Sequence, residues 1–115
     1  MNYRLLSDDQ LEYVPLADAA ELPVGERLFV TIDNSPIVLF NIAGQIFAIE
    51  DTCSHDGNPL DDAPLEGHAV ICPRHGARFD LHTGRALSMP AAADIAAYPV
   101  RVRDGQIEIG WPKTG

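Results

Sequence analysis

Two short segments, each carrying one cysteine and one histidine, constrain this sequence more than any other feature. They are Cys53-Ser54-His55 and Cys72-Pro73-Arg74-His75, and 16 residues separate them. A thiol and an imidazole two or three residues apart in a turn can point at one locus, and a glycine shortly after each segment lets the chain bend there. The two segments use both cysteines and two of the four histidines of the chain. We therefore expect Cys53, His55, Cys72 and His75 to converge on one metal centre.

The donor set leaves less specific readings open. Two cysteines and two histidines also satisfy tetrahedral zinc, although zinc spacing usually groups the cysteines in one segment and the histidines in another. A chance arrangement without metal is the other alternative. His68 and His82 are interpreted as structural, because the first begins a predicted strand and the second precedes a turn. Arg74 is expected near the centre, either tuning it, contacting a partner or simply solvated. Asp56 is interpreted as a turn residue, with a partner contact as the alternative.

Alternating apolar and polar residues between turn signals predict short antiparallel strands along most of the chain. We expect them at Leu11–Leu16, Arg27–Ile32, Ile37–Ile42, Gln45–Glu50, His68–Cys72, Ala77–Leu81, Tyr98–Arg103 and Gln106–Gly110. Asp104-Gly105 predicts a type I′ hairpin turn. The pattern indicates an all-β chain with one domain at 11–115, and an irregular insert at about 51–87 that carries the metal centre.

Three connecting segments lack this alternation. Residues 1–10 are polar, and we expect a lead-in that frays. Ala17–Gly25 is predicted to form one helical turn or a loop, since Pro23 and Gly25 stop it. Met89–Ala97 is rich in alanine but lacks an amphipathic stripe, so an extended or irregular connection is expected there.

Length and charge narrow the possible functions. A chain of 115 residues fits one domain. Its net charge of −9 comes without any basic stretch, so nucleic acid is not an expected partner. No run of about 18 apolar residues predicts a membrane span. The N-terminal part also lacks the apolar stretch of a secretory signal, so we expect a cytoplasmic protein whose two cysteines bind metal rather than form a disulfide.

With these residues in view, the sequence resembles the Rieske ferredoxins from about Leu22 to Gly110. The similarity lies in CSHDGNPL from Cys53, in CPRHGARFDLHTGRAL from Cys72 and in the closing YPVRVRDGQIEI. It implies an antiparallel β-sandwich with a small cluster-binding lobe, and one [2Fe–2S] cluster per chain. By this resemblance Cys53 and Cys72 bind one iron, and His55 and His75 bind the other.

The ligand set implied by the resemblance predicts how easily the centre is reduced. With two thiolates and two neutral imidazoles the oxidised cluster has no net charge, so its potential falls roughly between −150 and +300 mV, against about −400 mV for plant-type sites. High-potential Rieske proteins carry a disulfide and two hydroxyl donors around the cluster. This chain has Asn58 and Arg74 at the cysteine positions, and Ala77 and Phe79 at the hydroxyl positions. We therefore expect a potential near −150 mV.

The resemblance points to a ferredoxin of a multicomponent aromatic-ring dioxygenase. Such a protein carries single electrons from a flavin-containing, NAD(P)H-dependent reductase to a terminal non-haem iron oxygenase, through contacts at the histidine tip. It transforms no substrate itself, so we expect no enzyme, and we expect a monomer. A small Rieske-like subunit of a nitrite reductase, or of another stable redox complex, is the alternative function.

Overall fold

The protein is described by a computed structural model that places residues 1–54, 57–60, 62–74, 76–88 and 93–113. Within this part of the chain the secondary structure is almost entirely β, and every strand pair is antiparallel. The strands are β1 (Leu11–Asp18), β2 (Arg27–Ile32), β3 (Ser35–Ile42), β4 (Gln45–Glu50), β5 (Leu65–Glu66), β6 (Ala69–Ile71), β7 (Arg78–Asp80), β8 (Ala97–Tyr98), β9 (Val100–Arg103) and β10 (Gln106–Pro112). Two 3₁₀ turns precede β1, η1 (Tyr3–Leu5) and η2 (Asp8–Gln10), and a third, η3 (Ala19–Glu21), lies between β1 and β2.

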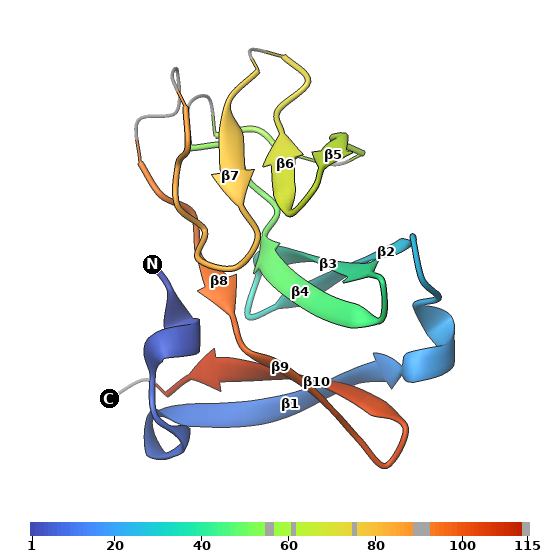
Figure 1. The fold of residues 1–115 in the computed structure, drawn as a ribbon. Helices are drawn as coiled ribbons and strands as arrows, with labels where there is room; N and C mark the ends of the chain where they lie inside the picture. Colours follow the sequence, from blue (N-terminus) through green and yellow to red (C-terminus); the bar gives the residue numbers. More distant parts are fainter. Residues whose placement is uncertain (55–56, 61, 75, 89–92, 114–115) are drawn as a thin grey trace.

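The strands form three sheets. One has the order β1-β10-β9, the second β2-β3-β4-β8 and the third β5-β6-β7. Figure 1 shows the second sheet in the middle, the first below it and the small third sheet above it. This arrangement confirms the predicted antiparallel sandwich, with the β5-β6-β7 sheet in the lobe that carries the two cysteine segments.

The middle sheet is buried on both faces, and the sequence of β3 and β4 explains why. Val38, Phe40 and Phe47 point to a core shared with the lobe. Their neighbours Leu39 and Ala48 point the other way, to a core shared with β10. Side chains alternate between the two faces of a strand, so a strand covered on both faces must be apolar at successive positions. The apolar run in β3 is therefore what places the lobe over the sandwich.

Tight turns fix the register of the hairpins. At Asp104-Gly105 the φ angles are 52° and 77°, both positive as a type I′ turn requires, which confirms the predicted turn. The turn between β2 and β3 is also of two residues, Asp33 and Asn34, with φ of 49° and 64°. It is shorter than the four-residue turn suggested by the sequence, because Ser35 and Pro36 already belong to β3.

The N-terminal segment differs from the frayed lead-in that its polar sequence suggested. The backbone N–H of Ala97 donates to the carbonyl of Met1 at 3.0 Å, and Asn2 forms a parallel bridge with Ala97. The Tyr3 ring stacks on Tyr98 with centroids 5.2 Å apart. Trp111 stacks on the other side of this contact, with its ring centroid 5.0 Å from that of Tyr98. Burial raises the pKa of Tyr98 above its ordinary value, so this ring stays neutral between its two neighbours.

Replacing Tyr3 with alanine tests this packing. We expect Y3A to lower the free energy of unfolding by about 1–2 kcal/mol, because it removes an aromatic pair and its buried area. Leu5 is 82% exposed, so L5A in the same turn is the control and should change stability by less than about 0.5 kcal/mol. Urea unfolding of both variants provides the measurement. Equal effects of Y3A and L5A would show that the segment is not packed through Tyr3.

The segment predicted as an irregular connection lies partly outside the described residues, at 89–92. From residue 93 it is irregular as far as Ala96, and Ala97 then begins β8 against β4. Ile95 and Ala97 are fully buried in the core shared with the lobe. Among the described residues, no helix is long and apolar enough to span a membrane.

Candidate metal centre

The two cysteine segments form loops with the same backbone hydrogen bonds. In the first loop the Cys53 N–H donates to Asn58 O at 2.8 Å, and Gly57 N–H donates to Cys53 O at 2.8 Å. In the second loop the Cys72 N–H donates to Ala77 O at 2.7 Å, and Gly76 N–H donates to Cys72 O at 2.9 Å. Each loop is therefore closed around its cysteine in the same way.

The glycines of the two loops occupy equivalent positions, each four residues after the cysteine. Gly57 has φ of 71° and Gly76 has φ of 75°, in the left-handed region that strains other residues. Neither has a heavy atom within 4 Å of where a Cβ would stand. The loops therefore need glycine for its backbone conformation and not for lack of space.

Neighbouring segments hold both loops on the lobe. The Asp51 N–H donates to Pro36 O at 2.9 Å where the chain leaves β4, and Ile71 N–H donates to Pro64 O at 2.9 Å where it leaves β6. Ser54 Oγ donates a hydrogen bond to Ala93 O, so the segment after residue 92 also contacts the first loop. This third contact could not be predicted, because an alanine in a loop carries no recognisable signal.

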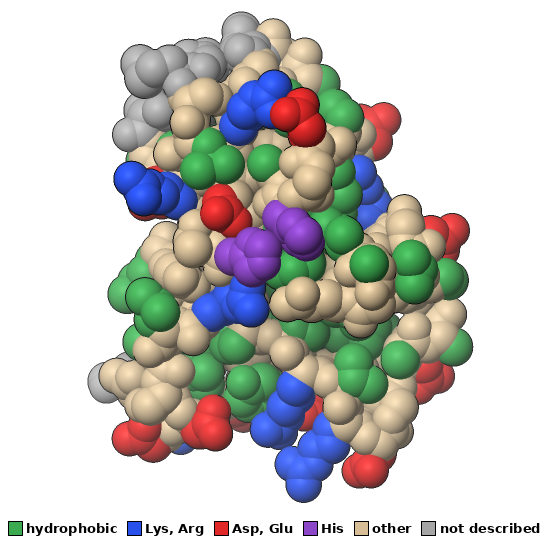
Figure 2. All heavy atoms as spheres, viewed as in Figure 1, with side chains coloured by type: hydrophobic (Ala, Val, Ile, Leu, Met, Phe, Trp, Pro, Cys, Tyr) green, Lys and Arg blue, Asp and Glu red, His purple; other side chains and the backbone are tan. Residues whose placement is uncertain are grey.

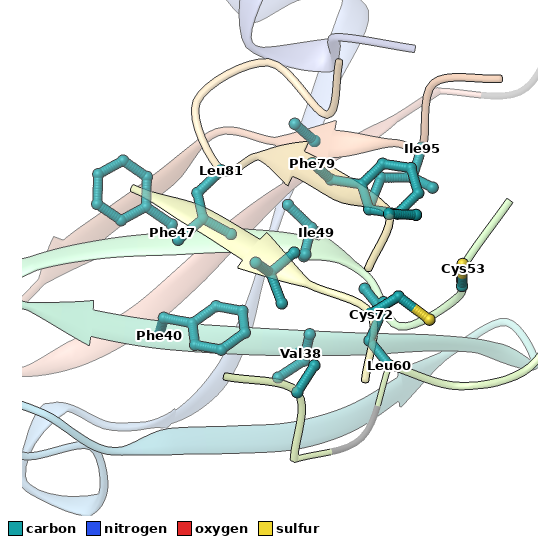
Figure 3. Packing of buried hydrophobic residues seen from close by; sticks show 14 residues of the cluster. Val38, Phe40, Phe47, Ile49, Cys53, Leu60, Cys72, Phe79, Leu81 and Ile95 are labelled. Carbon is teal, nitrogen blue, oxygen red and sulfur yellow. The ribbon is translucent and has the colours of Figure 1, made fainter. Parts of the chain in front are cut away.

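Both cysteines are fully buried and belong to one core cluster. They are not joined by a disulfide. Figure 3 shows Cys53 and Cys72 at the end of this cluster away from Phe47, with Leu60 close by. Two thiols brought together in a dry site, on loops that need no other covalent link, fit a soft metal centre.

His55 and His75 lie outside the described residues, as does Asp56. Among the residues that are described, no three His, Cys, Asp or Glu side chains are grouped to hold a metal. The complete ligand set therefore stays a prediction. Its two cysteine members belong to one buried cluster. In the sequence, each histidine stands between a cysteine and the residue whose carbonyl accepts from that cysteine's N–H.

Arg74 joins the two loops through its side chain. Its Nη2 donates to Asn58 O at 3.4 Å, and this is the carbonyl that also accepts from Cys53 N–H. Arg74 is exposed, but it is not the simply solvated side chain that the sequence left as one reading. Ala77 and Phe79 are fully buried beside the second loop.

His68 and His82 lie at the other end of the β6–β7 hairpin. His68 precedes β6 and His82 follows β7, whereas the second cysteine loop joins these strands at the opposite end. Their rings are 4.9 Å apart, and Phe47 contacts both edge to face. His82 Nδ1 lies 3.2 Å from Asp80 Oδ1. Figure 2 shows the pair at the surface between lobe and sandwich, which fits the structural role predicted for them.

Comparison with known proteins identifies the type of centre. Residues 12–99 match the model of the Rieske [2Fe-2S] domain. The 3-phenylpropionate/cinnamic acid dioxygenase ferredoxin subunit of Escherichia coli (strain K12) is 44% identical over 96 residues, which cover 82% of this chain and 89% of that protein. The ferredoxin component of the naphthalene 1,2-dioxygenase system of Pseudomonas aeruginosa is 37% identical over 89 residues, covering 77% and 86% of the two chains.

The fold is also similar to that of a solved structure. It is a complex of reduced oxygenase and oxidised ferredoxin in carbazole 1,9a-dioxygenase. A chain of that complex superposes with a TM-score of 0.78 at 26% identity, covering 90% of this chain and 97% of that one. The structural similarity thus extends over nearly the whole fold, and the residues of the family match, 12–99, include both cysteine segments.

Proposed function

The chain belongs to the family of Rieske [2Fe-2S] domains, and from this premise we propose that it carries single electrons from a flavin-containing, NAD(P)H-dependent reductase to a terminal non-haem iron oxygenase of the aromatic-ring dioxygenase type. Similarity to ferredoxin subunits of such dioxygenases, over 77–82% of this chain and 86–89% of those proteins, carries the proposal. The superposition on a chain from an oxygenase–ferredoxin complex supports the oxygenase as one partner. The reductase is inferred from the need for an electron source.

The cofactor of this family, one [2Fe–2S] cluster, fits the residues that the structure describes. Two buried thiols on matched loops provide the cysteine half of a Rieske site, in which two cysteines bind one iron and two histidines the other. We propose that Cys53 and Cys72 bind the first iron and that His55 and His75 bind the second. When bound, the cluster accepts and releases one electron. The protein is thus a carrier and not an enzyme in isolation.

The surface charge suits short-lived contact with changing partners. A net charge of −9 favours fast encounter with a basic docking face and makes that encounter sensitive to salt. A carrier that must leave one partner for the next gains from a small interface. We accordingly propose a cytoplasmic monomer that docks through the tip of the lobe, where the cysteine loops lie.

A single-turnover experiment tests the proposal. The protein is loaded anaerobically with iron and sulfide, reduced, and mixed with the oxygenase of the 3-phenylpropionate/cinnamic acid dioxygenase system. We expect the oxygenase to oxidise the reduced protein. The rate should fall as the salt concentration rises, because the Debye length is about 10 Å at 0.1 M and shorter above it. A protein that stays reduced under conditions where the ferredoxin of that system is oxidised would contradict the proposed partner.

Exchanging one histidine for cysteine tests the ligand set. We expect a potential near −150 mV for the native protein, and a drop on the order of 100 mV in H55C, because a third thiolate adds negative charge to the site and the potential moves toward the −400 mV of all-thiolate centres. His68 supplies a matched control, since H68C introduces the same side chain at the far end of the hairpin and should leave the potential unchanged. Redox titration measures both. An unchanged potential in H55C would remove His55 from the ligand set.

A further inference from the structure

The contact between Arg74 and Asn58 connects the two halves of the proposed cluster site. Asn58 O closes the first loop by accepting from the Cys53 N–H at 2.8 Å. The same carbonyl accepts from Arg74 Nη2, 3.4 Å away, across 16 positions of sequence. A movement of the second loop is therefore passed directly to the atom that shapes the backbone around Cys53.

The backbone of the second loop limits how far Arg74 can move. It lies between Cys72 and Gly76, and these two residues are joined by the 2.9 Å hydrogen bond from Gly76 N–H to Cys72 O. Cys72 itself is fully buried. The Arg74 side chain thus starts from a loop closed by this hydrogen bond and ends on a carbonyl that also accepts from the Cys53 N–H. Its planar guanidinium keeps its donors in a rigid arrangement, whereas a lysine offers one flexible ammonium group.

The charge of Arg74 has a separate consequence. A guanidinium stays protonated at any ordinary pH, so it keeps a positive charge beside the loops in both redox states. Reduction adds one negative charge to the site, and a nearby positive charge favours the reduced form. Arg74 is exposed, so salt weakens this effect.

We propose that Arg74 is a positioning residue that fastens the second cysteine loop to the first through Asn58 O, and that its charge makes the centre easier to reduce. The proposal rests on the proposed [2Fe–2S] site. Its two parts, the link between the loops and the charge, are separable by substitution. R74Q removes both parts. R74K keeps the positive charge but loses the rigid arrangement of the guanidinium donors.

Three measurements on the loaded protein test the two parts. They are the rate at which a chelator removes iron, the midpoint potential at low and high salt, and hydrogen exchange of the amides at 51–60. We expect R74Q to release iron about fivefold faster, the factor that corresponds to losing one ordinary hydrogen bond. Its amides should exchange faster and its potential should be lower, with the difference shrinking at high salt. R74K should keep the native potential but release iron faster than the native protein.

Arg85 supplies the matched control for net charge. It is an exposed arginine on the same lobe, and it follows β7 at the end of the hairpin opposite the second cysteine loop. R85Q should leave iron release, potential and amide exchange at native values. If R85Q lowers the potential as much as R74Q, the effect belongs to overall charge and the electrostatic part is wrong. If R74Q releases iron and exchanges its amides at native rates, the link between the loops is wrong.

Failure of the proposed function gives a different result. A native chain that assembles no [2Fe–2S] cluster would contradict the cluster site itself, before any variant is compared. Amide exchange at 51–60 still reports on the hydrogen bond in such a sample, because the Cys53 N–H and Asn58 O contact requires no metal. Faster exchange in R74Q than in R85Q would then support the link between the loops alone.

Discussion

Replacing Cys72 with alanine is expected to leave a folded but colourless protein that binds no [2Fe–2S] cluster. The Cys72 thiol is fully buried, and its loop is closed on both sides of the residue by backbone hydrogen bonds. Alanine keeps the apolar contact of the Cβ but offers no thiolate, and no other cysteine than Cys53 exists in the chain to replace it. Iron and acid-labile sulfide content after anaerobic loading, with the visible spectrum, measure the outcome.

Val70 provides the control for lost core packing. It lies on β6, it is fully buried, and it belongs to the same core cluster as Cys72. V70A should lower stability by about 1–3 kcal/mol through the cavity it leaves, yet the protein should still bind a full cluster. Loss of the cluster in both variants would mean that packing and not ligation decides the result. A normal cluster spectrum in C72A would contradict the site altogether.

The strands were predictable wherever the local pattern carried the whole signal. Arg27–Ile32 and Gln45–Glu50 were expected from alternation, and β2 and β4 have these bounds. β5 was missed, because a strand of two residues between Pro64 and Gly67 is too short for any alternation to be visible. Its pairing with β6 places it, since Leu65 pairs with Val70 and Glu66 with Ala69.

The error at the N-terminus has a different physical cause. Residues 1–10 end in the polar run Ser7 to Gln10 and carry no extended strand pattern, so their sequence alone predicts weak packing. The contacts that hold them come from Tyr98 and Ala97 near the other end of the chain. A ring stack and hydrogen bonds over such a distance leave no trace in local composition. Only the fold reveals them.

More of the candidate site than of the fold could be predicted, because few residue types can bind a metal. Cysteine and histidine at short spacing are rare, so the two loops could be found from sequence, and the structure brings their cysteines into one cluster. The link from Arg74 to Asn58 could not be predicted, since an exposed arginine has many possible partners. The positions of His55 and His75 stay predictions.

Replacing Gly84 with alanine is expected to lower stability more than adding a methyl group at any other glycine in the described part of the lobe. A Cβ at Gly84 would stand 1.9 Å from Ile95 O and 2.9 Å from Ile95 C, both backbone atoms that cannot rotate away. Ile95 N–H also donates to Gly84 O at 2.8 Å, so the two segments are already in contact. The segment with buried Ile95 and Ala97 must move, which we expect to cost about 3–5 kcal/mol.

Gly67 separates the clash from the cost of backbone conformation. Its φ of 60° is also left-handed, like the 75° of Gly84, but no atom lies within 4 Å of its Cβ position. G67A should therefore lower stability by only about 1 kcal/mol, the usual cost of placing a side chain in that region. Urea unfolding of the cluster-loaded proteins measures the difference in stability. If G84A is insoluble while G67A is soluble, the clash destabilises the fold even more than expected. Equal stability of the two variants would contradict the close contact between Gly84 and residues 95–97.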